Sequence, residues 1–116
     1  EASMTLGEKQ RRFTKCIGML IGYAYANGYE LTFGDAYRDP RLHGGWGEKK
    51  GYGASRSVHK VRLAVDLNLF KDGKWLQDSA DHKFLGDYWK ALDPSARWGG
   101  DFEDGNHYSF EHEGCK

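Results

Sequence analysis

The sequence predicts a single small α+β domain in which an antiparallel sheet is flanked by helices. A chain of 116 residues with 39% hydrophobic and 29% charged residues fits one domain, residues 1–116, with one packed core. One long segment near the N-terminus has hydrophobic residues at helical spacing, whereas several short segments alternate between apolar and polar residues. Sixteen glycines and two prolines predict many turns between these segments.

The first helix is predicted over residues 5–27. Thr5 and Glu8 have the spacing of a capping box, and Gly28 follows as a C-terminal stop. The helical period is carried by Phe13, Cys16, Ile17, Leu20, Ile21 and Tyr25. A short strand is then predicted over residues 29–34.

The middle of the chain predicts a loop followed by a hairpin. Residues 39–56 carry five glycines and no apolar period, and loops of this length are often functional. Alternation predicts a strand over residues 62–70, and a turn at residues 71–74 leads into a return strand at residues 75–76.

The last third of the chain predicts a second helix and two strands. The helix extends over residues 79–92 and is ended by Asp93 and Pro94. Short strands are predicted at residues 96–98 and 107–111, around a glycine-rich turn.

Charge and hydropathy narrow the function classes. Seventeen basic and seventeen acidic residues argue against a nucleic-acid binder that relies on bulk charge. No apolar run approaches the ~20 residues of a membrane span, and no signal sequence opens the chain. Residues 1–3 are expected to be a remnant of processing or cloning before a native start at Met4. Cys16 and Cys115 are expected to be independent thiols, with a single disulfide as the alternative.

Two residues around the central strand suggest a metal site. His59 stands just before the strand, and Asp66 stands inside it between Val65 and Leu67. An ionised carboxylate at such a position is costly to bury unless it is paired or bound to a metal. The alternative is simple alternation, in which Asp66 faces water and the core side is formed by Leu63, Val65, Leu67 and Leu69.

A second pair of residues follows the glycine-rich turn, where Asp104 precedes His107 by three positions. Zinc catalysis uses three N or O ligands, an open position for water and a carboxylate near that water. His59, Asp66 and His107 can supply the ligands, and Asp104 the general base. Asp101 is a rival base, although a turn carboxylate that bonds backbone N–H groups is the ordinary interpretation.

Three stretches resemble the M15 zinc peptidases, which include D-alanyl-D-alanine carboxypeptidases, D,D-dipeptidases and phage L-alanyl-D-glutamate endolysins. Residues 57–67 contain the pattern SxHxxxxAxD, and they are followed by WGGDF at residues 98–102 and DGNH at residues 104–107. The resemblance extends from Tyr37 to His107 and implies a fold like that of hedgehog and the D-Ala-D-Ala peptidases.

By this resemblance, His59, Asp66 and His107 are zinc ligands, and Asp104 stands at the catalytic acid/base position. Arg38 matches the arginine that steadies the substrate carbonyl and the developing oxyanion. Many family members have glutamate at the acid/base position, and aspartate there is similar to the endolysin branch.

The resemblance implies a zinc-dependent peptidoglycan peptidase, in particular an L-alanyl-D-glutamate endopeptidase in phage or prophage lysis. Arg62 stands where many carboxypeptidases have glycine, so this position also departs from the carboxypeptidase branch. The alternatives are a D-alanyl-D-alanine carboxypeptidase or dipeptidase, and a non-catalytic zinc-containing binding module. The expected partner is the bacterial stem peptide, reached by a monomer that is made in the bacterial cytoplasm and acts on the cell wall after release or export.

Other residues are secondary candidates. His43 lies in the long loop as a candidate substrate contact, whereas His82 and His112 are expected at the surface. Peptide substrates need apolar walls, so some of four aromatic residues are expected to line the cleft and the others to be core, namely Trp46, Tyr52, Trp98 and Tyr108.

Overall fold

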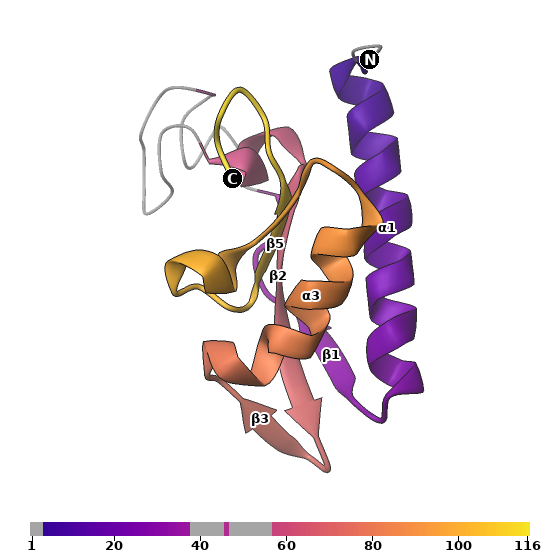
Figure 1. Ribbon diagram of the computed structural model, residues 1–116, viewed down its shortest axis with the longest axis vertical. Coiled ribbons are helices and arrows are strands. Elements are labelled where there is room, and N and C mark those ends of the chain that lie inside the picture. The colour runs from indigo at the N-terminus through magenta and orange to yellow at the C-terminus, as the bar shows by residue number, and fades with distance from the viewer. Residues whose placement is uncertain (1–3, 38–45, 47–56) are drawn as a thin grey trace.

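The computed structural model describes residues 4–37, 46 and 57–116, which form two α-helices and a five-stranded antiparallel sheet (Figure 1). In chain order the elements are α1 (Leu6–Ala26), β1 (Glu30–Phe33), the 3₁₀ helix η1 (Val58–Val61), β2 (Ala64–Lys71), β3 (Lys74–Leu76), the 3₁₀ helix η2 (Ser79–His82), α3 (Lys83–Leu92), β4 (Ala96–Trp98), the 3₁₀ helix η3 (Gly99–Phe102) and β5 (His107–Phe110). The predicted α+β fold class is confirmed.

Helix α1 begins and ends where its sequence signals predict. Thr5 Oγ1 accepts a hydrogen bond from Glu8 N at 3.1 Å, and Glu8 Oε1 accepts one from Thr5 N at 2.9 Å, so the capping box is complete. Gly28 has a φ of +83°, a conformation that glycine adopts without strain. None of the helices in the described part of the chain is both long enough and apolar enough to span a membrane.

The sheet is built around β2, whose two halves have different neighbours. The strand order is β1-β2-β5-β4, and β3 pairs with the C-terminal end of β2. The β2–β3 turn places Asp72 and Gly73 at φ values of +52° and +79°, as a tight hairpin requires. The N-terminal half of β2 pairs with β5, so that Asp66 lies opposite His107.

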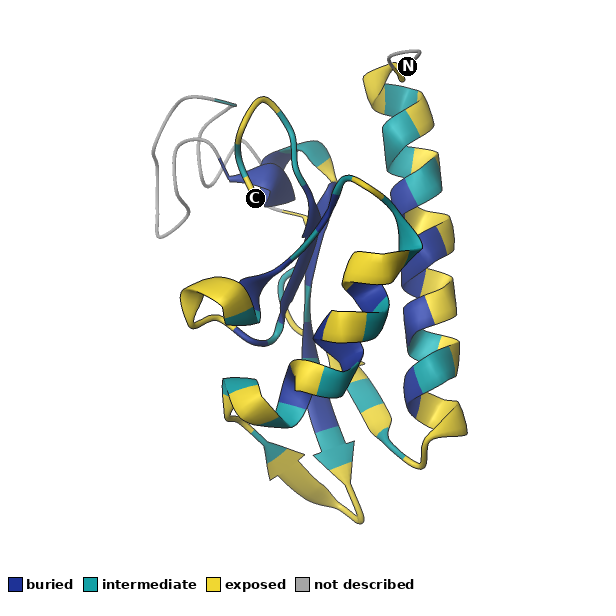
Figure 2. Cartoon of the chain, in the orientation of Figure 1, coloured by how far each residue is buried: buried dark blue, intermediate teal, exposed yellow. Residues whose placement is uncertain are grey.

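Both helices pack on one face of the sheet and enclose the core (Figure 2). Phe13 of α1 packs edge to face against Trp89 of α3 and Phe110 of β5, with distances between ring centroids of 5.6 Å and 5.3 Å. The core residues of the central strand and its approach are Leu63, Val65, Leu67 and Leu69, all almost fully buried. Because side chains alternate along a strand, Asp66 and Asn68 belong to the opposite face of the sheet.

The second predicted helix is divided into two elements in the structure, and its residue His82 is buried rather than exposed. Residues 79–82 form η2, and α3 begins only at Lys83. Ser79 Oγ accepts a hydrogen bond from Gly105 N at 3.0 Å, which ties the 3₁₀ turn to the loop before β5. The expectation of a surface His82 is wrong: its side chain is fully buried, and Nδ1 lies 2.9 Å from the hydroxyl of Tyr108.

Acidification is expected to destabilise the fold through His82. Burial lowers the pKa of His82, so the ring stays neutral in the folded chain while the unfolded chain takes up a proton near pH ~6.5. The unfolded state then binds more protons, so the free energy of unfolding falls as the pH drops through that value. Urea denaturation between about pH 7.5 and about pH 5.5 should show a smaller fall in His82→Gln than in the unsubstituted protein. Identical falls would contradict this role.

Gly86→Ala is expected to lower the free energy of unfolding. A Cβ at Gly86 of α3 would lie 2.2 Å from Cδ2 of the buried Trp98, and overpacking of this kind costs about 1–3 kcal/mol. Gly22→Ala in α1 is the matched control, because no heavy atom lies within 4 Å of a Cβ there. The control should gain up to about 1 kcal/mol from helix propensity. Urea denaturation measures both, and equal changes would refute the packing argument.

Candidate metal centre

Asp66 and His107 are placed by the register of two neighbouring strands. They are direct partners across β2 and β5, and both side chains belong to the face of the sheet away from α1 and α3. The alternation interpretation was therefore right about the face of Asp66. It was incomplete about the surroundings, because the Asp66 side chain is only 19% exposed and contacts two histidines.

His59 is held by the 3₁₀ helix η1 that precedes β2. Ser57 caps this helix, and its Oγ accepts a hydrogen bond from His59 N at 3.2 Å. The His59 ring is buried, and its Nδ1 lies 3.1 Å from the carbonyl oxygen of Ala36. Because a carbonyl can only accept, Nδ1 donates to it, and Nε2 is the ring atom that faces Asp66 and would bind a metal through its lone pair.

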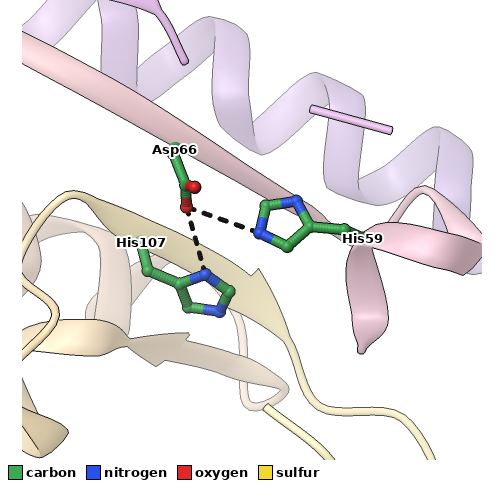
Figure 3. A group of neighbouring side chains, drawn as sticks. All are labelled: His59, Asp66 and His107. Atoms are coloured by element: carbon green, nitrogen blue, oxygen red, sulfur yellow. Dashed lines mark hydrogen bonds and ion pairs between the residues drawn. The ribbon is translucent and has the colours of Figure 1, made fainter. Parts of the chain in front are cut away.

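The three side chains converge on one carboxylate oxygen (Figure 3). Asp66 Oδ1 lies 3.4 Å from His59 Nε2 and 3.2 Å from His107 Nδ1. One potential ligand atom from each residue lies within 4.8 Å of the other two, so the group could bind a metal ion. The prediction that these three residues lie together is confirmed. A set of imidazole and carboxylate ligands suits several divalent transition metals, and zinc is one of them.

The electrostatics keep Asp66 ionised. Burial by itself would raise the pKa of Asp66, but hydrogen bonds from His107 and His59, together with the charge of these rings, hold that pKa well below its usual range. A metal ligand must be deprotonated, so the carboxylate is already in the form that binds.

Asp104 is not part of the ligand group, and it lines a separate pocket. Its backbone is fixed, since Asp104 N donates to Gly99 O at 2.7 Å and Asp104 O accepts from His107 N at 3.0 Å. The pocket measures about 250 Å³ and is also lined by Asn106, the neighbour of His107, and by Asn68. None of the three residues of the ligand group lines this pocket, and its other lining residues include Ser79 of η2 and the buried His82.

The other two carboxylates of this turn differ from expectation. Asp101 was expected to bond backbone N–H groups; instead its two oxygens lie 3.1 and 3.3 Å from Lys90 Nζ of α3. Glu103 lines the same pocket as Asp104, and sequence reasoning did not consider it. The turn therefore presents two carboxylates to the pocket and directs the third to a lysine.

The aromatic candidates mostly belong to the core. Trp98 and Tyr108 are buried, whereas Trp46 is partly buried and packs edge to face on His112 at 5.3 Å. The aromatic residue that sequence reasoning missed is Phe102, which is 42% exposed and lies 5.8 Å from the His107 ring.

Several predictions concern residues elsewhere. Arg38, His43 and Tyr52 lie outside the described residues. His112 was expected at the surface; its side chain is 19% exposed, and Nε2 lies 3.1 Å from a carboxylate oxygen of Glu113. The two cysteines, Cys16 and Cys115, are free thiols, as the favoured interpretation predicted.

In comparisons with known proteins, no family model matches this chain and no curated protein matches it significantly.

Proposed function

We propose that the protein is a zinc-dependent peptidase that hydrolyses amide bonds in peptidoglycan stem peptides. The observation that supports this most is the convergence of His59, Asp66 and His107 on one carboxylate oxygen. The substrate class comes from the resemblance of residues 57–67 and 104–107 to the M15 peptidases. The proposed enzyme acts as a monomer on the cell wall after release or export from the bacterial cytoplasm.

The donor set fits zinc. Two imidazole nitrogens and one carboxylate oxygen are ligands that hydrolytic zinc sites use, and three protein ligands leave one position for water or substrate. A zinc ion held by His59, Asp66 and His107 would polarise the scissile carbonyl and lower the pKa of a bound water to ~7. The buried ligand rings and the ionised carboxylate are already arranged for such binding.

The remaining chemistry is assigned to side chains of this chain. Asp104 takes a proton from the attacking water and returns it to the leaving amine, a role assigned from its place in the motif three residues before His107. Arg38 donates hydrogen bonds to the developing oxyanion, an assignment from the sequence alone and worth roughly 3 kcal/mol for one well-placed donor.

Arg62 adopts a backbone conformation that is more favourable for glycine. Its φ of +57° lies in the left-handed region, which is favourable for the glycine that many carboxypeptidases have there. In this chain the arginine adopts that conformation, and its guanidinium carbon lies 4.0 Å from the centroid of the Tyr37 ring. Cation–π contact of this kind stabilises an exposed arginine by about 0.5–1 kcal/mol. We propose that the scissile bond joins L-alanine to D-glutamate, because aspartate at position 104 and arginine at position 62 both depart from the carboxypeptidase pattern of the family that the sequence resembles.

Digestion of purified peptidoglycan followed by mass spectrometry of the fragments tests the proposal. The zinc-loaded protein should release stem peptides that begin with D-glutamate, whereas a carboxypeptidase would remove only terminal alanine. Metal-stripped protein is the matched control and should leave the wall intact. Failure of the zinc-loaded protein to release any fragment would refute the peptidase proposal.

A further inference from the structure

Two buried polar atoms of β5 lack a hydrogen-bond partner within the part of the chain that the structure describes. They are Nε2 of His107 and Oγ of Ser109. Ser109 is completely buried, and His107 is only 6% exposed. Buried polar groups without a partner are rare in folded proteins, so two of them on one four-residue strand need a common explanation.

The two atoms belong to the same face of the sheet. Residues two apart on a strand point to the same side, and the register pairs His107 with Asp66 and Ser109 with Ala64. The intervening Tyr108 packs against Trp89 in the core on the opposite side. The Ser109 hydroxyl is therefore the next group along from the His107 ring on the side of the metal centre.

Metal binding fixes where the proton of His107 must be. In the structure Nδ1 lies 3.2 Å from Asp66 Oδ1 and is the ring atom directed at the ligand group. A metal bound at Nδ1 uses the lone pair of that atom, so the neutral ring carries its proton on Nε2. That N–H is buried and requires an acceptor, because a buried donor left unpaired costs about 1–3 kcal/mol.

The other histidine of the group, His59, has an acceptor for its second ring N–H. Its Nδ1–H donates to the carbonyl of Ala36 at 3.1 Å, which leaves Nε2 free to face Asp66. Histidine ligands usually donate their second N–H in this way, and the partner fixes the orientation of the ring. His107 lacks such a carbonyl, whereas the serine hydroxyl beside it can either accept or donate.

We propose that Ser109 is the positioning residue of the metal ligand His107. Because the two atoms do not bond to each other directly in the structure, the hydroxyl oxygen accepts the Nε2–H hydrogen bond through one water and so holds the ring with Nδ1 toward the metal. The inference rests on the metal centre of the proposed function but not on peptidase activity.

The test is the zinc dissociation constant, measured by competition with a chromophoric chelator. Ser109→Ala should bind zinc about 10–100-fold more weakly than the unsubstituted protein. Ser95→Ala is the matched control, because Ser95 uses its backbone groups for its hydrogen bonds and lies away from the ligand group. It should bind zinc with unchanged affinity. Equal affinities of the two variants would overturn the proposal.

A second measurement follows the proton itself. Long-range proton–nitrogen NMR spectra of the zinc-loaded protein should show His107 protonated at Nε2, with a proton that exchanges faster in Ser109→Ala. A proton on Nδ1 would overturn the inference. Zinc binding without hydrolysis of peptidoglycan would refute the peptidase proposal and leave this inference standing, whereas absence of zinc binding would refute both.

Discussion

Replacing His59 with alanine is expected to abolish zinc binding and, with it, hydrolysis of peptidoglycan. The substitution removes one of three donors and leaves Asp66 with a single histidine partner. Two ligands do not make the closed set that holds zinc in proteins. Elemental analysis of the purified protein should find about one zinc per unsubstituted chain and none in the variant.

His112→Ala is the control for the loss of a histidine as such. The His112 ring is paired with Glu113 and is not part of the ligand group, so this variant should retain its zinc. If His59→Ala still contains zinc, then His59, Asp66 and His107 are not the zinc ligands, and the proposed mechanism is refuted.

Asp104→Ala is expected to keep its zinc and to lose about 10²–10⁴-fold in the rate of hydrolysis. The carboxylate is outside the ligand group and its side chain is exposed, so neither metal binding nor the fold depends on it. Initial rates on purified cell wall, compared at equal zinc content, measure the effect.

Glu103→Gln is the matched control, since Glu103 lines the same pocket one residue away. This variant should hydrolyse cell wall at close to the unsubstituted rate. If Glu103→Gln is inactive while Asp104→Ala remains active, the acid/base residue is Glu103 and the assignment from the sequence motif is wrong.

The parts of the fold that depend on nearby residues could be predicted from the sequence. Helix α1 follows from a capping box, an apolar period and a glycine stop, all of which act within a few residues. The faces of β2 follow from alternation, which is equally local. The ligand set was found by combining residue types, their spacing and the resemblance to a known family.

The features that could not be predicted depend on partners far along the chain. The polar neighbours of His82 suggested the surface, but its partner Tyr108 comes 26 residues later. Asp101 was expected in a local turn contact, yet it pairs with Lys90 on a separate helix. Ser109 carried no signal in the sequence, because its importance appears only when β5 is placed against β2.

Because Asp66 and His107 are partners across β2 and β5, a metal ion could be bound by this group only when the two strands are correctly paired. A slip of β5 by one residue would turn His107 toward the core and Tyr108 toward the ligands, so only one register can close the site. Any ion bound there stabilises the native sheet, by about 2.7 kcal/mol at 100 times its dissociation constant. If this group binds a metal ion, a shortage of that ion would reduce the amount of folded protein as well as the fraction of the protein that is loaded.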